Sequence, residues 1–318
     1  MLKITKMMAI VASAIIMLTS CQKYDNELPS IAAIAVQGAD FSTLEAAAIQ
    51  GGVAVVLSNK NAGDPSGNFT VFAPNNAAFA RLGLVDAGSL GALQNSFLTN
   101  TLLYHVSNGS TMGASLTVGS STASALGGVT RTIYARGADK YINGSKILAT
   151  DVQASNGIVH VVDKVMLATG VNIVASAQLL SNAQVFKTAE LTFLVQAVVT
   201  SGLAPTLANP SNNFTIYAPT DAAFRAAGFP TVASVAAAPP AVLQAVLLNH
   251  AIGTGRFTAE QTALTATTAG GGMLTYSAFN NGTFTIKSNG ITTPANMVIP
   301  DIKCLNGVVH VIDRVLLP

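Results

Sequence analysis

The stretch Asn-Gly-Ile-Val-His-Val-Val-Asp-Lys-Val-Met-Leu-Ala occupies residues 156–168. A near copy, Asn-Gly-Val-Val-His-Val-Ile-Asp-Arg-Val-Leu-Leu-Pro, occupies residues 306–318. Each copy begins with an Asn-Gly turn signal and continues with β-branched residues, a pattern typical of a β-strand that leaves a tight turn. Both faces of this strand are mainly apolar, so we expect a central strand that is covered on two sides.

Other segments recur in the same order. Residues 69–79, Phe-Thr-Val-Phe-Ala-Pro-Asn-Asn-Ala-Ala-Phe, return at 214–224 as Phe-Thr-Ile-Tyr-Ala-Pro-Thr-Asp-Ala-Ala-Phe, 145 positions later. Leu-Leu-Tyr-His at 102–105 returns at the same spacing as Leu-Leu-Asn-His at 247–250, whereas the final segments are 150 positions apart. All four histidines of the chain fall into these pairs. The pattern indicates an internal duplication with one insertion of five residues.

The duplication predicts the domain organisation. Two copies of one unit account for residues 31–168 (domain 1) and 171–318 (domain 2), and a length of 318 residues is enough for two cores. The connection Ala-Thr-Gly-Val-Asn at 168–172 is short and has no Pro-rich or Ser-rich spacer. So brief a linker predicts that the domains touch or are held within a narrow range of angles.

The N-terminal segment 1–20 has the layout of a secretory signal peptide. Two lysines precede an apolar run from Met7 to Leu18, which is too short to span a bilayer comfortably. The sequence Leu-Thr-Ser-Cys at 18–21 resembles the lipobox of bacterial lipoproteins, so Cys21 is expected to carry lipid and residues 21–30 to form a tether. An ordinary cleaved signal peptide with an incidental cysteine, or an uncleaved anchor, is the alternative.

Charge and cysteine content exclude several classes. Without residues 1–20, 14 basic residues face 14 acidic ones, so a neutral chain offers no electrostatic surface for nucleic acid. Beyond the N-terminal segment no uninterrupted apolar run is long enough for a membrane-spanning helix. The two cysteines are Cys21 and Cys304. If Cys21 is lipidated, no disulfide can form within the chain, and Cys304 is expected to be buried and inert.

Each unit is expected to place helices before strands, which makes the fold class α+β. Ser42, followed by Glu45, is expected to cap a helix through a capping box, and Asn75 or Asn76 to cap a short one. Longer helices are expected over 89–106, with Leu90, Leu93 and Phe97 on one stripe, and over 239–252, with Val242, Val246 and Asn249 spaced similarly. The last third of each unit has strand patterns, from which we expect an antiparallel sheet.

The sequence carries no established catalytic or metal-binding motif. The histidine spacing is not that of a zinc site, and no Gly-x-Ser-x-Gly elbow supports a catalytic serine. His160 and Asp163, three positions apart on a strand, point to opposite faces. We therefore expect a protein that is not an enzyme and that needs no cofactor, although a triad or an acid pair assembled only in space stays open.

The order of these motifs resembles the fasciclin (FAS1) domain family, and it does so twice over essentially the whole of residues 31–318. The resemblance implies two tandem wedges of β-strands flanked by helices. It also implies an extracellular or surface-attached adhesion module. In animal matrix members a Tyr-His segment and an Asp-Ile pair before the last strand are implicated in receptor binding.

These family residues give the candidate partner-binding site. Tyr104 and His105 match the Tyr-His segment in domain 1, and Asn249 and His250 stand there in domain 2. The second pair is matched by Asp301 and Ile302, and in domain 1 by Asp151 and Val152. A structural role for these residues is the alternative. A structural role is the prediction for His160, His310, Asp163 and Asp313.

The resemblance and the lipobox together predict the function. We expect a lipoprotein of the bacterial cell envelope, in the outer membrane or at the cell surface, whose tandem domains bind a protein or matrix ligand. Two weak sites on one anchored chain gain strength by avidity. Glycan binding, or an accessory role in nutrient uptake across the envelope, is the alternative, and a polysaccharide is then the partner. The absence of Trp and the presence of only six Tyr weigh against sugar stacking. A hydrolase is a third possibility that no motif supports.

Overall fold

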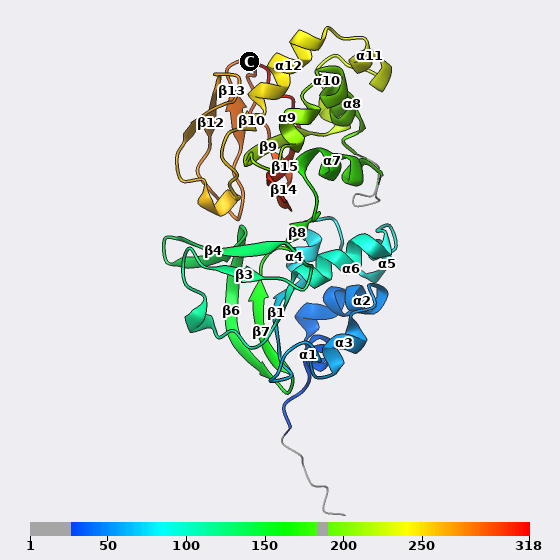
Figure 1. Ribbon diagram of the computed structural model, residues 1–318, viewed down its shortest axis with the longest axis vertical. Helices are drawn as coiled ribbons and strands as arrows, with labels where there is room; N and C mark the ends of the chain where they lie inside the picture. Colours follow the sequence, from blue (N-terminus) through cyan, green and yellow to red (C-terminus); the bar gives the residue numbers. More distant parts are fainter. Residues whose placement is uncertain (1–26, 183–189) are drawn as a thin grey trace, which may run out of the picture.

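The computed structural model describes residues 27–182 and 190–318. The predicted signal peptide, Cys21 and the tether up to residue 26 lie outside these ranges. Domain 1 and domain 2 are stacked along the long axis of the molecule, and the chain enters domain 1 at the end away from domain 2 (Figure 1).

Domain 1 has its helices on one side of a sheet. The helices, with the short 3-10 helices η1 and η2, are α1 (Ile31–Gln37), η1 (Ala39–Phe41), α2 (Ser42–Gln50), α3 (Ala54–Ser58), α4 (Asn76–Ala80), α5 (Ala87–Leu90), α6 (Asn95–Tyr104) and η2 (Gly113–Ser115). The strands are β1 (Phe69–Pro74), β2 (Val106–Asn108), β3 (Ser121–Ala123), β4 (Thr130–Arg136), β5 (Asp139–Ile142), β6 (Ser145–Ala154), β7 (Gly157–Val162) and β8 (Leu167–Ala168). The strand order is β2-β1-β7-β6-β5-β4-β3.

Domain 2 repeats this arrangement. Its helices are α7 (Ile173–Asn182), α8 (Thr192–Thr200), α9 (Ala204–Ala208), α10 (Asp221–Ala226), α11 (Val232–Ala236), α12 (Pro240–Asn249) and η3 (Thr258–Glu260). Its strands are β9 (Phe214–Pro219), β10 (Ala251–Ile252), β11 (Thr265–Thr267), β12 (Met273–Tyr276), β13 (Ile286–Ser288), β14 (Met297–Cys304) and β15 (Gly307–Ile312). One sheet has the order β10-β9-β15-β14-β8 and a second has the order β11-β12-β13.

The α+β class is confirmed, but the sheets are mixed rather than antiparallel. The repeated Asn-Gly strands, β7 and β15, are central as predicted, each between two other strands. On one side β7 pairs with β1 in parallel, and β15 pairs with β9 in parallel, whereas the β6 and β14 neighbours are antiparallel. Strand patterns fix that these segments are extended; they do not fix the direction of a partner some 90 residues away.

The Asn-Gly pair has a role beyond a turn. The amide of Asn156 accepts a hydrogen bond from Ile31 N at 2.9 Å and donates to the carbonyls of Leu57 and Asn59 at 2.8 and 2.7 Å. In domain 2, Asn306 makes the same three bonds, to Ile173, Leu207 and Asn209. One buried asparagine thus ties the start of the first helix and the end of the third to the central strand of each domain.

The cap of the second helix differs from the prediction. Ser42 is the first residue of α2 and its side chain does not cap the helix, so the capping box with Glu45 is not formed. Asn76 supplies the missing acceptor, because its Oδ1 takes the hydrogen bond of Thr43 N at 3.0 Å. Asn75 caps its own helix α4. Thr220 and Asp221 divide the same two tasks in domain 2, where Asp221 Oδ1 accepts from Phe193 N at 3.1 Å.

Two predictions about the long helices are wrong in detail. The helix expected over 89–106 is split into α5 and α6, with Gly91 as the C-cap of α5. In α12 the buried face is formed by Leu243 and Leu247, while Val242 is exposed. Apolar residues surround this helix on most sides, so the periodicity did not single out the buried face.

The two domains are in direct contact, as the short linker predicted. Strand β8 at the end of domain 1 extends the sheet of domain 2 by pairing in parallel with β14, Leu167 opposite Ile302. The Lys164 ammonium group reaches three oxygens of domain 2: Asp301 Oδ2 at 2.7 Å, the Gly282 carbonyl at 2.7 Å and Thr258 Oγ1 at 3.2 Å. Both partners of the Lys164–Asp301 ion pair are buried.

Further contacts surround this buried pair. The guanidinium group of Arg136 donates to the carbonyls of Ala259 and Gln261 and lies over the ring of Phe279, 4.1 Å from its centre. Arg81 donates to the Asn281 carbonyl at 2.8 Å. Because polar, ionic and strand contacts act together, the domain pair is one packed unit.

The burial predicted for Cys304 is confirmed. Cys304 is buried, and burial raises the pKa of its thiol, so it is an inert core residue. Within residues 27–182 and 190–318 no helix is long and apolar enough to cross a membrane.

Candidate functional site

The predicted Tyr-His segment ends helix α6, and its side chains point into the protein. Tyr104 and His105 in domain 1, and Asn249 and His250 in domain 2, are all buried. None of the four offers its side chain to a partner at the surface. Their role in partner binding stays a prediction, and any such role has to act through the shape of the segment.

Each of these histidines holds the helix end against the segment that follows β7 or β15. His105 Nδ1 lies 2.7 Å from the Thr101 carbonyl, and Nε2 accepts a hydrogen bond from Met166 N at 2.9 Å. His250 makes the same pair, to the Val246 carbonyl at 2.8 Å and from Leu316 N at 2.8 Å. A ring that accepts at Nε2 and donates at Nδ1 is neutral.

Burial supports this neutral state. Desolvation of the charged ring lowers the pKa of His105 and of His250 to about 4. The two rings meet carbonyls in the last turn of their helices, those of Thr101 and Val246. They do so as uncharged donors, so the attraction of a cation to the helix dipole plays no part at neutral pH.

Tyr104 lies in a buried polar cluster that the sequence did not reveal. Its hydroxyl donates to the Thr130 carbonyl at 3.0 Å and accepts a bond from Asn143. The buried guanidinium group of Arg131 donates to the Tyr104 carbonyl at 2.8 Å and lies over the Phe72 ring at 5.0 Å from its centre. Desolvation lowers the pKa of Arg131 to about 10 and raises that of Tyr104, so the arginine is charged and the phenol neutral at pH 7.

Domain 2 fills the same region differently. Asn249 donates to the Leu316 carbonyl at 2.9 Å, and the hydroxyl of Tyr217, the counterpart of Phe72, donates to that of Tyr276 at 3.0 Å. The tyrosine is therefore replaced by an amide without a surface consequence.

The Asp-Ile pair sits in a β-bulge that recurs in both domains. Asp151 and Asp301 have positive φ angles of 64° and 67°, a conformation that Asp and Asn tolerate better than other residues. Their backbone N–H groups donate to Nδ1 of His160 at 3.3 Å and of His310 at 3.0 Å. These buried histidines hold the bulge, in keeping with the structural role predicted for them.

The two bulges differ in exposure. In domain 2, Asp301 and Ile302 are buried against domain 1. In domain 1, Asp151 is half-buried and Val152 is 38% exposed. Of the eight predicted site residues, only Asp151 and Val152 reach the surface. Asp163 and Asp313, predicted to be structural, accept backbone bonds from Lys146 N and Asn296 N.

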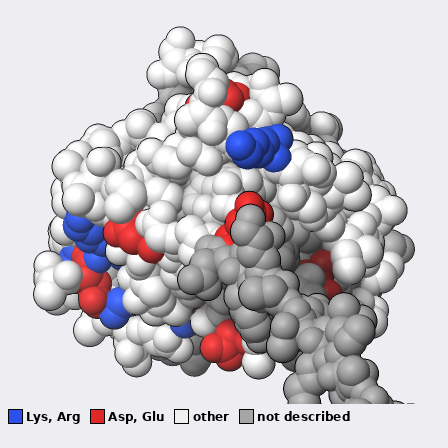
Figure 2. Space-filling model, turned by 90° about the horizontal axis from the view of Figure 1, so that it is seen from below, with Lys and Arg blue, Asp and Glu red and all other residues white. Residues whose placement is uncertain are grey.

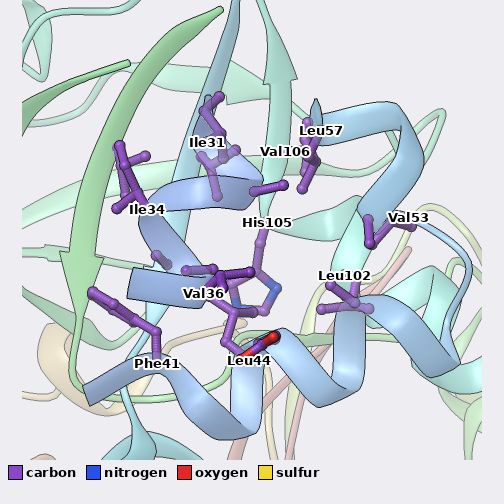
Figure 3. A pocket seen from close by; sticks show the side chains of 18 of the residues that line it. Ile31, Ile34, Val36, Phe41, Leu44, Val53, Leu57, Leu102, His105 and Val106 are labelled. Carbon is purple, nitrogen blue, oxygen red and sulfur yellow. The ribbon is translucent and has the colours of Figure 1, made fainter. Parts of the chain in front are cut away.

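An apolar hollow of domain 1 lies where helices α1, α2 and α3 meet β1 and β7. It is a cavity of about 150 Å³, and Figure 3 shows Ile31, Ile34, Phe41 and Leu44 converging on it. Leu102, His105 and Val106 form part of its wall (Figure 3). We call this cavity the domain 1 pocket. The predicted Tyr-His segment therefore contributes to a binding-sized hollow through His105, from the inside.

The rim of the domain 1 pocket is apolar and exposed. Val36 at the end of α1 is 61% exposed, and Ile49 near the end of α2 is 65% exposed. Glu45 is the one charged side chain that lines the pocket, and both ring nitrogens of His105 are already occupied. The site can hold an apolar group, and it offers a carboxylate beside it for a positive charge.

Domain 2 has the same hollow in a collapsed form. The cavity between α7, α8 and α9 measures about 30 Å³. Helix α7 has ten residues where α1 has seven, and Leu180 in its last turn is buried in the core. The two domains thus share a fold but not this site.

The described residues form no cluster of metal ligands. Within residues 27–182 and 190–318 no three His, Cys, Asp or Glu side chains gather as metal ligands would. The four buried histidines are each engaged with backbone groups, as described above.

Comparison with known proteins identifies the repeat. The family model described as "Fasciclin domain" matches residues 39–168 and again residues 189–318. The chain belongs to the fasciclin-domain family.

Curated relatives agree with this membership. The transforming growth factor-beta-induced protein ig-h3 of Sus scrofa is 31% identical over 258 residues, which cover 79% of this chain and 35% of that protein. Protein sll1483 of Synechocystis is 35% identical over 139 residues, covering 43% of this chain and 73% of the relative. The chain spans about a third of the length of the animal relative.

A solved fasciclin-domain pair is also similar. It comes from the insect cell adhesion molecule Fasciclin I, is 16% identical, and is matched over 79% of this chain and 89% of its own with a TM-score of 0.38.

Within the fasciclin pair, the family resemblance pointed to the end of α6, and no sequence motif pointed to the domain 1 pocket beside it. The domain 1 pocket is built from ordinary core residues of the first three helices, and a cavity among them leaves no motif. One signal was present: Ile49 and Val36 are large apolar residues at exposed helix positions. Exposed apolar residues next to a hollow are characteristic of contact surfaces.

Proposed function

We propose that this fasciclin-domain protein is a non-enzymatic adhesion lipoprotein, tethered to the bacterial surface through Cys21, that binds a protein or matrix ligand. Two features support the proposal: the signal segment that ends in Leu-Thr-Ser-Cys, and the duplicated domain of the fasciclin family. An acylated N-terminus would hold the protein at a membrane without a spanning helix.

The observation that carries the binding proposal is the domain 1 pocket with its exposed apolar rim. A cavity of about 150 Å³ has room for the end of one aliphatic or aromatic side chain. Glu45, the only charged residue lining it, favours a partner in which that side chain is flanked by a lysine or arginine. The ligand we propose is therefore a polypeptide segment with an apolar anchor next to a basic residue.

Among the described residues, the corresponding cavity of domain 2 measures only about 30 Å³, and this difference gives an internal control. Ile49 on α2 and Val199 on α8 occupy matching positions and are 65% and 59% exposed. Lysine at either position is tolerated by an exposed helix, so the fold should be unchanged. Lysine at 49 places a charge on the pocket rim, whereas lysine at 199 lies next to the collapsed cavity.

The test compares cell attachment to matrix-coated surfaces. A deletion strain would be complemented with the natural gene, with Ile49→Lys, with Val199→Lys and with Cys21→Ala. We expect attachment to be restored by the natural chain and by Val199→Lys, and to fall at least several-fold with Ile49→Lys. Equal attachment by the two lysine variants would remove the pocket from the proposal, and unchanged attachment of the deletion strain would remove adhesion.

The Cys21→Ala strain tests the tether separately. The expected result is protein released from the membrane fraction into the medium or periplasm, with no incorporation of labelled fatty acid. Retention of Cys21→Ala in the membrane fraction would contradict lipid anchoring while leaving the domain 1 pocket to be judged on its own.

Glycan binding has less support. Sugar-stacking sites need an exposed aromatic face, and among the described tyrosines four are buried: Tyr104, Tyr141, Tyr217 and Tyr276. The fifth, Tyr134, packs on Phe257 of domain 2 with ring centres 6.1 Å apart. We therefore favour a polypeptide ligand.

A further inference from the structure

The contact between the two domains has a donor end and a receiving face, and the duplication places a copy of each at the opposite ends of the molecule. The donor end in domain 1 consists of Lys164, Val165 and Leu167. The receiving face in domain 2 consists of the bulge at Asp301 and Ile302, with Phe257 beside it. The second donor end belongs to domain 2 and the second receiving face to domain 1.

The second receiving face has the same geometry but no cover. Asp151, Val152 and Met112 correspond to Asp301, Ile302 and Phe257, and the bulge shifts the register of β6 and β14 at the same positions. Covered by domain 1, Ile302 is 1% exposed and Phe257 5% exposed, whereas Val152 is 38% and Met112 45% exposed. The described part of the chain places nothing over these two side chains that would bury them similarly.

The Asp151 carboxylate on this face can still accept a cation at Oδ2. In domain 2, Asp301 Oδ1 accepts from Thr258 N, and Oδ2 accepts from Thr258 Oγ1 and Lys164 Nζ. In domain 1, Asp151 Oδ1 accepts from Gly113 N at 2.7 Å, but the glycine has no hydroxyl to reach Oδ2, and no cation of the described residues lies there. Figure 2 looks at the end of domain 1 away from domain 2 and shows a largely neutral surface, with one group of positive and negative side chains at its left.

The second donor end is also free and complementary. Arg314 corresponds to Lys164, is exposed, and makes no ion pair or side-chain hydrogen bond with the described residues. Together with Val315 and Leu317, Arg314 lines an open hollow of about 280 Å³. The matching hollow of domain 1, next to Val165 and Leu167, is nearly filled by Ile299 of domain 2, with about 20 Å³ remaining.

We infer that domain 1 of one chain receives domain 2 of a second copy of the same chain, with Arg314 paired to Asp151 and Leu317 packed on Val152. The contact is head-to-tail and repeats the one between the domains within a chain. Because the two surfaces differ, such a contact extends into rows or closes into rings rather than stopping at a symmetric dimer. This inference is independent of the proposed adhesion function.

The contact between chains is expected to be weaker than the contact between the two domains within a chain. Within a chain the linker supplies an effective concentration in the millimolar range, which a second copy lacks. Ala149 stands where domain 2 has Ile299, so the hollow at the end of domain 2 receives a smaller side chain. Association should therefore depend on concentration, and on salt, because an exposed ion pair is screened.

The experiment is sedimentation velocity of the chain purified without residues 1–21, which leaves both described domains whole, from about 5 µM to 1 mM. We expect the weight-average mass of the natural chain to rise above that of a monomer as the concentration increases. Arg314→Asp and Val152→Arg each disable one of the two surfaces at an exposed position, so each should require at least tenfold higher concentration for the same rise. Asp151→Asn, which keeps a residue suited to positive φ, should act in the same direction.

Matched controls and a mixture make the result specific. Lys287→Asp and Val85→Arg introduce the same changes at exposed positions away from both surfaces and should associate like the natural chain. An equimolar mixture of Arg314→Asp and Val152→Arg should form heterodimers that stop at two chains, because each variant keeps one intact surface. The inference would be overturned if the natural chain stayed monomeric at every concentration, or if neither variant changed the association. It would also be overturned if the equimolar mixture formed no heterodimers.

Discussion

At the scale of single residues, the ion pair between Lys164 and Asp301 decides how the domains are joined. Two buried charges stabilise an interface only when each has its partner, since removal of one leaves the other without compensation. In domain 2 the counterpart of Lys164, Arg314, is exposed. A substitution at this position is therefore expected to change the free energy of unfolding much more in domain 1 than in domain 2.

Replacing Lys164 with methionine should lower the free energy of unfolding by about 3 kcal/mol, because Asp301 is left buried without a cation. Adding Asp301→Asn should recover part of this loss, since the amide carries no charge and still accepts from Thr258 N. Arg314→Met is the matched control and should change stability by less than about 0.5 kcal/mol. Denaturant unfolding of the natural chain, the two methionine variants and the double variant measures these differences in the free energy of unfolding. Equal effects of the methionine variants at 164 and 314 would contradict the buried role of the pair.

The buried histidines predict a dependence of stability on pH. For His105 and His250 the pKa in the folded protein is about 4, below the ordinary value of 6.5 that applies when the chain is unfolded. Stability is therefore full above pH 6.5, where neither state is protonated. Between pH 6.5 and 4 the unfolded chain takes up protons that the folded chain does not, and each histidine costs roughly 1.4 kcal/mol per pH unit.

Ring C–H chemical shifts in NMR spectra provide the measurement. The resonances of His105 and His250 should not titrate above about pH 5, and unfolding free energies at pH 7, 5.5 and 4.5 should decrease in that order. Titration of either ring near pH 6.5 would show that it is solvated and would contradict the tautomer assigned from its hydrogen bonds.

At the scale of elements, the parallel pairing of β1 with β7 depends on Gly157. Its φ of 147° is within the range that favours glycine, and a Cβ at this position would lie 2.0 Å from the Phe69 carbonyl oxygen. Gly157→Ala should cost at least about 3 kcal/mol because either the strand pair or the turn has to shift. Gly127→Ala, where a Cβ would meet nothing within 4 Å, is the control and should be nearly neutral. Thermal unfolding distinguishes them, and similar midpoints for both variants would contradict the close approach.

Sequence patterns predicted the elements better than the contacts between them. The repeated Asn-Gly strands and the Asn75 cap follow from local chemistry, and the structure places them as predicted. The cap that Asn76 provides for α2, and the direction of β1 against β7, depend on residues about 30 and 90 positions apart. The break between α5 and α6 shows the same limit, since tertiary packing decides where a weakly patterned apolar segment stays helical.

The candidate site shows this division most clearly. A family resemblance led to Tyr104 and His105, whose burial no pattern of the sequence revealed. The buried Arg131 that lies near Tyr104, and the pocket next to His105, arise from packing among segments distant in the chain. The corresponding cavities of the two domains also differ in volume, about 150 against 30 Å³. Small differences of packing thus separate two copies of one fold.

At the scale of the whole molecule, β8, Lys164 and Arg136 hold the two fasciclin domains in one fixed arrangement. If Cys21 is acylated as proposed, the ten residues 21–30 would span at most about 35 Å and would keep domain 1 close to the membrane. Head-to-tail rows would then run along the surface rather than away from it. Both the presentation of the domain 1 pocket and the assembly of chains follow from this fixed arrangement.

The most direct test is a distance distribution between spin labels on the two domains, measured by pulsed electron spin resonance. Cysteines at the exposed positions Val85 and Val242 would carry the labels in the chain without residues 1–21, while buried Cys304 stays unlabelled. We expect one narrow distance distribution, which broadens in the Lys164→Met variant. A broad or multimodal distribution in the natural chain would mean that the domains move independently and would contradict their fixed arrangement.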